Sequence, residues 1–264
     1  MRNKTGSFRV VFVLVLIFVL AASPTAADAS HAWGNYHWAR TSNPFTLKVG
    51  DNVNSTWDPY LRRAISDWSK SSALNLTKVA GSTSGKTCRP KTGRIEVCNA
   101  AYGDTGWLGV AQIWADGDHI TQGTARMNDT YFKTAPYNAP AWRRLVMCQE
   151  VAHTFGLDHQ DVDFSNPNLG TCMDYTSNPA GPPSNEHPNA HDFEELEIIY
   201  SHLDSTSTFR RAPSTASAGF ASADMQAQSN WGEKSEESAD GHSALYVRDF
   251  GKGLKVFTFV FWAE

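Results

Sequence analysis

Beyond its first thirty residues the chain has no apolar run long enough to cross a membrane, and it has no excess of basic charge. Its 23 Lys and Arg stand against 27 Asp and Glu, for a formal net charge of −4. A mildly acidic, mixed surface lacks the electrostatic footprint of a nucleic-acid-binding protein. We therefore expect no nucleic-acid partner, and no membrane attachment after the N-terminal segment is removed.

The N-terminal segment has the three parts of a secretory signal peptide. Basic residues precede an apolar run over 10–22, and Ala27-Asp28-Ala29 offers a small-x-small cleavage site. The apolar run is too short for a membrane span, although an uncleaved anchor is the alternative. We predict a signal peptide over 1–29 and a secreted, extracellular mature protein. Cleavage would remove three basic residues and one acidic residue, which takes the formal charge from −4 to −6.

Cysteine is scarce, with four residues, and no pair has the C-x-x-C spacing of a cysteine-metal site. Four cysteines in an exported chain indicate two disulfides, for which three pairings are possible. A Cys88–Cys98 bond would close a short local loop. Free buried thiols are the alternative.

The mature chain predicts mixed secondary structure. Alternating or apolar segments predict strands at 45–49, 74–79, 94–98, 107–114 and within 119–128. Apolar residues at helical spacing predict helices over 58–70 and 191–203. Another helix is expected to begin at Pro140, which suits a first helical turn, and to end at Gly156, which tolerates a left-handed conformation.

The C-terminal part changes character. Residues 206–243 are rich in Ser, Ala and Gln and read as a flexible linker after a main domain over 30–205. Residues 244–264 predict a β-hairpin around a Gly-Lys-Gly turn, with three phenylalanines on one face. Left exposed, that stripe would invite pairing with other chains, so we expect it to pack on the main domain.

The most informative stretch runs from Met147 to Tyr175, and residues 149–159 within it read QEVAHTFGLDH. This stretch resembles the metzincin zinc-peptidase pattern H-E-x-x-H-x-x-G-x-x-H followed by a Met-turn. The glutamate, two histidines and glycine fall in register, and Gln149 stands where the pattern has its first histidine. Met173, in the sequence CMDY, corresponds to the Met-turn.

The resemblance implies an α+β fold, a metzincin-like zincin domain with a twisted mixed sheet, an active-site helix and a C-terminal helix. It implies a Zn²⁺ cofactor held by Gln149, His153 and His159. Positions four apart share one face of a helix, so the first two ligands can point at one ion. Gly156 lets the chain turn back towards the third, and zinc keeps a fourth position open for water.

The resemblance also implies a reaction, the hydrolysis of peptide bonds in protein or peptide substrates by a monomer. Glu150 is then the general base, and Tyr175 assists the metal site and the transition state. Met173 forms an apolar floor. A Cys148–Cys172 disulfide is favoured because the resemblance brings those segments together.

One further expectation comes with the resemblance, and it has an open alternative. Gly109-Val110-Ala111 resembles the edge strand that pairs with extended substrate in metzincins, whereas an ordinary core strand is the alternative. The remaining histidines are expected to be structural or exposed, and Asp158 to be solvated. These histidines are His31, His37, His119, His187, His191, His202 and His242.

Gln149 leaves three outcomes open, because an amide oxygen is a poorer zinc donor than imidazole. The amide binds a weaker zinc, another group such as Asp161 or water fills the position, or the metal is absent. In the last case the chain would be an inactive metzincin-fold pseudopeptidase that acts as an extracellular binding module. The glutamate kept in register at 150 favours the enzyme.

Overall fold

The computed structural model describes Met1, residues 31–209 and residues 218–263, so the predicted signal peptide after Met1 lies outside the described residues. One mixed sheet runs through the described part of the chain in the order β3-β2-β4-β6-β5-β9-β8-β7, with β1 beside β6. Its strands are β1 His37–Trp38, β2 Phe45–Asn52, β3 Leu74–Ala80, β4 Arg94–Ala100, β5 Trp107–Asp116, β6 His119–Asn128, β7 Glu233–Glu237, β8 Ser243–Asp249 and β9 Leu254–Trp262.

The sheet has a parallel half and an antiparallel half. Strands β3, β2, β4 and β6 pair in parallel, whereas β6, β5, β9, β8 and β7 pair antiparallel. Parallel neighbours need a crossover, and α1 (Asp58–Trp68) supplies the one between β2 and β3. The predicted α+β class with a mixed sheet is confirmed.

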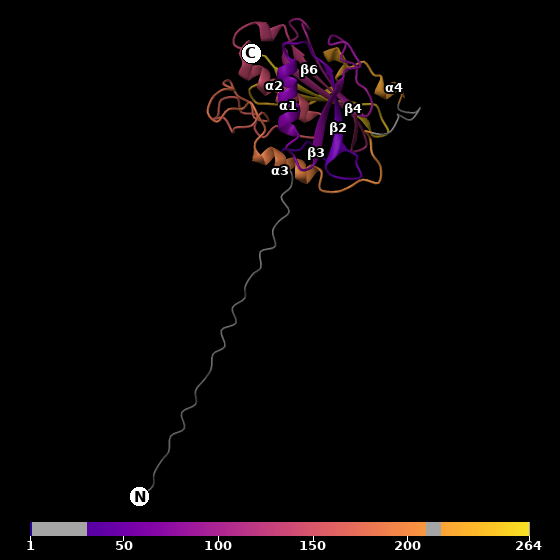
Figure 1. Cartoon of the computed structure of the whole chain (residues 1–264), viewed down its shortest axis with the longest axis vertical. Helices are drawn as coiled ribbons and strands as arrows, with labels where there is room; N and C mark the ends of the chain where they lie inside the picture. The colour runs from indigo at the N-terminus through magenta and orange to yellow at the C-terminus, as the bar shows by residue number, and fades with distance from the viewer. Residues whose placement is uncertain (2–30, 210–217, 264) are drawn as a thin grey trace.

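Helices α1 and α2 (Pro140–His153) pack on one face of the sheet, and Figure 1 shows α1 in front of the strands. Trp68 of α1 donates its indole N–H to the carbonyl oxygen of Cys148 at 3.1 Å, which joins the two helices. Helix α2 begins at Pro140 as predicted, and Gly156 has the expected positive φ of 109°. Helix α3 (Ala190–Ile199) begins with a capping box, and α4 (Ala218–Ala221) is a single turn.

No helix among the described residues combines the length and the apolar character that a bilayer crossing needs.

Strand β5 lies inside the sheet and not at its edge, which corrects the expectation drawn from the resemblance. It pairs with β6 on one side and with β9 on the other, where Ala111 stands opposite Phe259. The alternative expectation, that residues 109–111 belong to an ordinary core strand, is confirmed. The physical reason is that an open, apolar edge is a liability, and the C-terminal hairpin closes it with main-chain hydrogen bonds.

The linker prediction is corrected for residues 218–243. This segment holds α4, a 3₁₀ turn over Gln228–Asn230 and strand β7, which pairs with β8. Its few large apolar residues, Phe220, Met225 and Trp231, are buried with Trp114 in a second core on the far face of β5 and β9. Composition alone hides this packing, because three well-placed residues are enough to hold the segment. Residues 210–217 lie outside the described part.

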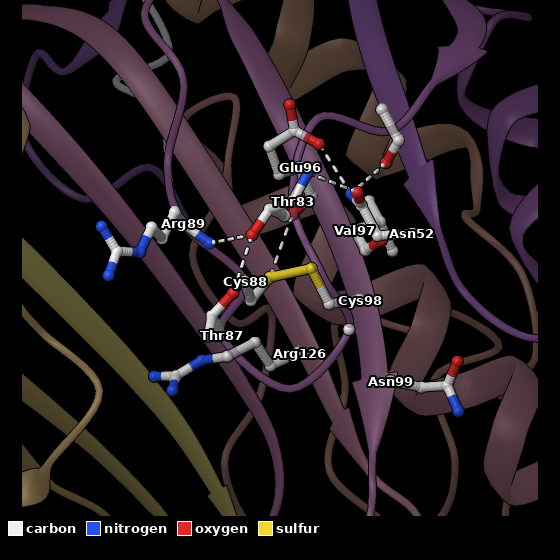
Figure 2. The surroundings of a disulfide bond; sticks show 12 residues. Asn52, Thr83, Thr87, Cys88, Arg89, Glu96, Val97, Cys98, Asn99 and Arg126 are labelled. Atoms are coloured by element: carbon white, nitrogen blue, oxygen red, sulfur yellow. Dashed lines mark hydrogen bonds between the residues drawn. A yellow bond between two sulfur atoms is a disulfide. The ribbon is translucent and has the colours of Figure 1, made fainter.

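Both favoured disulfides are confirmed. The Cys88–Cys98 bond, with Cα atoms 5.8 Å apart, holds the loop after β3 against β4 (Figure 2). Inside that loop the backbone N–H of Arg89 donates to the Thr83 hydroxyl at 2.9 Å. The Cys148–Cys172 bond, with Cα atoms 5.9 Å apart, joins α2 to the segment before Met173.

Candidate metal centre

The C-terminal end of α2 carries the motif into the interior. Gln149 has no exposed surface, and Glu150 and His153 are each 1 % exposed. The helix packs on β5 and β6, so these polar side chains lie between the helix and the sheet. Polar groups at such depth need partners, because each unpaired one costs about 1–3 kcal/mol.

Two motif histidines turn their ring nitrogens towards each other. The Nε2 atoms of His153 and His159 are 3.0 Å apart. The Nδ1 of His153 is 2.8 Å from the carbonyl oxygen of Leu157, and the Nδ1 of His159 is 3.3 Å from Oδ1 of Asp158. Because those oxygens accept only, each Nδ1 carries the proton, and in the neutral imidazoles both Nε2 atoms keep a lone pair. Two Nε2 lone pairs that face each other in this way can both bind one cation.

Asp158 was expected to be solvated, and the structure corrects this. Its carboxylate accepts from both the backbone N–H and the ring of His159. Burial acts to raise the pKa of this carboxyl, but hydrogen bonding to His159 outweighs burial and leaves the pKa below its usual value. Asp158 therefore orients the ring of His159, a role that the sequence pattern does not reveal.

Gln149 lies four residues before His153, on the same face of α2. Neither its amide oxygen nor its amide nitrogen has a hydrogen-bond partner in the described structure, although the side chain is fully buried. A buried amide without a partner, on the helix face that also carries His153, fits a metal ligand whose oxygen binds the ion. The residues present therefore fit a Zn²⁺ ion with two nitrogen donors and one oxygen donor.

Glu150 lies against the backbone of β5. A Cβ atom added at Gly109 would come within 2.4 Å of its Oε1 atom, so the glycine leaves the room that the carboxyl group occupies. Burial raises the pKa of Glu150 well above its usual value, and Arg126 and a backbone hydrogen bond from Ala111 oppose that rise. Burial thus favours the protonated form of this carboxyl, whereas a general base acts in its ionised form.

Tyr175 contacts His159, and Met173 is buried two residues before Tyr175 in the chain. The Tyr175 ring is 4.7 Å from that of His159, and burial raises the pKa of its hydroxyl well above the usual value. Met173 is buried, and its carbonyl oxygen accepts from the backbone N–H of Gln160 at 2.6 Å. The segment after Cys172 thus runs beside the chain that leaves His159.

Asp161, considered as a substitute ligand, closes a local turn. Its Oδ1 accepts from the backbone of Asp163 at 2.7 Å, and its Oδ2 accepts from the Asn166 amide at 2.6 Å. Both oxygens are thus engaged within the loop.

Strand β9 covers the centre. Phe259 stacks on His153 with ring centroids 4.4 Å apart, and Phe261 lies 4.5 Å from Tyr175. A cavity of about 130 Å³ remains between His159 and strands β7 and β8. The phenylalanine stripe was visible in the sequence, but no linear signal specifies the surface on which it packs.

Comparisons with known proteins give structural likenesses of low identity. No family model and no curated protein matches the sequence. The chain is similar to high choriolytic enzyme 1, a hatching-enzyme zinc protease of medaka, Oryzias latipes, with a TM-score of 0.38 and 11 % identity over 66 % of this chain and 99 % of that one. Two structures of myroilysin have TM-scores of 0.34 and 0.33 at 11 % identity, over 61 % and 66 % of this chain and 82 % and 96 % of theirs.

Proposed function

We propose that this protein is a secreted, monomeric, zinc-dependent endopeptidase that hydrolyses peptide bonds in protein or peptide substrates. The observation that carries the proposal is the 3.0 Å approach of the His153 and His159 Nε2 atoms, together with the buried, unpartnered amide of Gln149 one helical turn before His153. Both Nδ1 atoms are occupied by acceptors, so the rings are oriented for a metal. The signal peptide over 1–29 and the main domain over 30–205 belong to this proposal.

In this proposal Gln149, His153 and His159 hold the ion, which when bound supplies a Lewis acid that activates water near neutral pH. Glu150, the residue after Gln149 on α2, takes a proton from the attacking water and returns it to the leaving amine. Positive charge at the ligands favours its ionised form and so opposes the effect of burial. Tyr175 donates its hydroxyl hydrogen bond towards the reacting group.

A second candidate is the inactive pseudopeptidase, in which the same fold serves as an extracellular binding module. The observation that favours it is strand β9, which pairs along β5 from Trp107 to Asp116 and so occupies the edge that an extended substrate would use. The cavity of about 130 Å³ beside His159 admits a few waters and no extended peptide. Activity therefore requires that β9 move.

The first test is the metal content of the purified mature protein by plasma mass spectrometry after exhaustive dialysis. Cleavage of a denatured protein substrate is then compared for the wild type, Glu150→Gln and an exposed control, Asp104→Asn. The enzyme predicts chelator-sensitive cleavage that Glu150→Gln lowers by about 10²-fold or more, while the control keeps the wild-type rate.

A third variant, Gln149→His, separates the two candidates. For the enzyme we expect zinc affinity to rise about tenfold or more, because imidazole replaces an amide oxygen. The binding module is supported if the folded protein binds no zinc at His153 and His159 and if the Gln149→His variant is also inactive. Cleavage that resists both the chelator and Glu150→Gln would rule out the proposed mechanism.

A further inference from the structure

Three imidazoles and one carboxylate meet where β1 lies beside β6, away from the motif. His37 of β1 stands in register with His119, the first residue of β6, and the chain returns after α3 with His202 and Asp204. The Nε2 atoms of His37 and His119 lie 3.4 and 3.2 Å from Oδ1 of Asp204. The Nε2 of His202 is 3.1 Å from that of His37 and 3.9 Å from the same oxygen.

The outward atoms of His37 and Asp204 are already engaged. The Nδ1 of His37 donates to the carbonyl oxygen of Asn35 at 2.6 Å, so its Nε2 carries a lone pair in the neutral ring. The other oxygen of Asp204, Oδ2, accepts from the backbone and guanidinium of Arg40 at 3.1 and 3.0 Å. One ring nitrogen each from His37 and His119 and one carboxylate oxygen of Asp204 lie within 4.8 Å of one another, and the Nε2 of His202 lies 3.1 Å from that of His37.

We propose that His37, His119, His202 and Asp204 form a Zn²⁺ site that is separate from the motif. Zinc bonds of about 2.0–2.2 Å at tetrahedral angles place neighbouring ligand atoms about 3.3–3.5 Å apart. Four of the six distances among these donor atoms, from 3.1 to 3.9 Å, lie around that value. Three imidazole nitrogens and one carboxylate oxygen are also donors that zinc accepts.

With His202 as the fourth ligand, the site would have no open position, which is the pattern of a structural zinc site. It ties together the N-terminal segment, the start of β6 and the chain that leaves α3. Arg40 is a positioning residue, since its guanidinium also donates to the carbonyl oxygen of His202 and stacks 4.7 Å from the Tyr200 ring. A bound metal would hold residues 202–204 in place, and these precede the C-terminal strands that cover the motif centre.

The test uses the two exposed ligands, since the side chains of His119 and His202 are 39 % and 52 % exposed. Their replacement in His119→Ala/His202→Ala removes donors without opening a core cavity. Zn²⁺ is titrated into chelated, dialysed protein and measured at equilibrium. We expect the double variant to bind one equivalent less than the wild type. His159→Ala, which alters only the motif, keeps this equivalent, so failure of the motif site and of this site are distinguishable.

His191→Ala serves as the matched control. His191 belongs to another histidine–carboxylate group, with His31 and Glu195, and its side chain is 36 % exposed. The control should bind zinc at His119 and His202 as the wild type does. Equal zinc stoichiometry in the wild type and the His119→Ala/His202→Ala variant, both folded by circular dichroism, would overturn the proposal.

A spectroscopic variant gives a second, independent readout. With Co²⁺ as the probe, His119→Cys offers a thiolate in place of one imidazole and adds a sulfur-to-cobalt absorption band in the near ultraviolet. The band should be absent from the wild type and from Ser229→Cys, an exposed position in the Gln228–Asn230 turn that belongs to neither cluster. No new band in folded His119→Cys protein would also contradict the site.

Thermal unfolding supplies the third readout. A metal held at about 100 times its Kd raises the Tm of a domain of this size by about 5–10 °C. We expect excess Zn²⁺ to raise the Tm of chelated His159→Ala by that amount and to leave the Tm of His119→Ala/His202→Ala/His159→Ala unchanged. The same rise in both variants would exclude the cluster as its cause.

Discussion

The imidazole of His153 lies flat against the phenyl ring of Phe259, with centroids 4.4 Å apart and an interplanar angle of 7°. These residues are more than one hundred positions apart in the chain, and the contact joins the candidate metal centre to the C-terminal strand. It exists because β9 pairs with β5 in a register that places Phe259 opposite Ala111. The accessibility of the centre is thus set by a strand outside the motif.

Phe259→Ala should uncover His153 and destabilise the fold. Removal of a buried phenylalanine costs about 3–5 kcal/mol of unfolding free energy. We expect faster carbethoxylation of His153 by diethyl pyrocarbonate in chelated protein, followed by peptide mass spectrometry. Phe257→Ala is the control, because Phe257 is buried in the same strand but contacts Trp33 and Tyr36. Equal labelling rates in the two variants would contradict the prediction that Phe259 shields His153.

Gly109→Ala should displace Glu150. The added methyl group would meet Oε1 of Glu150 at 2.4 Å and Cγ1 of Val146 at 2.6 Å, so the helix or the carboxyl must shift. We expect a loss of about 1–3 kcal/mol in urea unfolding, typical of overpacking, and a fall in any peptidase activity. The control is Gly219→Ala, where a Cβ meets nothing within 4 Å. A Gly109→Ala protein with wild-type stability and activity would contradict the close contact.

The two disulfides should separate stability from function. Each closes a loop of 10 or 24 residues, and loss of either is expected to cost about 3 kcal/mol. Only Cys148–Cys172 joins α2 to the Met173 segment, so Cys148→Ser/Cys172→Ser should also weaken zinc binding at the motif. Cys88→Ser/Cys98→Ser is the matched control. Calorimetry and zinc titration below both midpoints measure the two effects, and equal zinc affinities would refute the link.

Asp192 should make stability fall as pH rises. Burial raises the pKa of its carboxyl to about 6, against hydrogen bonds from Thr171 and Asn189 that lower it. The folded state therefore binds this proton more tightly than the unfolded chain, whose aspartate pKa is about 3.9. Stability from this group is full below about pH 4 and is lost as pH rises through 6, a change of about 3 kcal/mol.

Asp192→Asn tests this linkage in urea unfolding at pH 4 and pH 7 with chelator present. The wild type should lose about 3 kcal/mol more than the variant over that interval, since only the wild type ionises at this position. Asp104→Asn, an exposed change, should follow the wild type. Parallel losses in Asp192→Asn and the wild type would show that burial does not shift this carboxyl.

Most elements of the main domain could be read from short-range pattern. The period-2 run at 45–49 and the apolar run at 107–114 became β2 and β5, and Pro140 began α2, because these signals depend on neighbours in the chain. The parallel pairing of β4 with β6 could not be read this way, since their partners are chosen by burial over long sequence separations. The composition of segment 218–243 predicts a linker, because only three of its residues are large, apolar and buried.

Sequence by itself determined the chemistry on offer, namely the register of Glu150, His153 and His159, the glutamine at 149 and the apolar hairpin. Local geometry on a helix and a turn depends on spacing alone, so these features follow from the sequence. Only the tertiary structure decided that β9 covers the centre and that His37, His119 and His202 face one carboxylate oxygen. Those contacts join distant segments, and the free energy of burial that selects them is a property of the whole packed sheet.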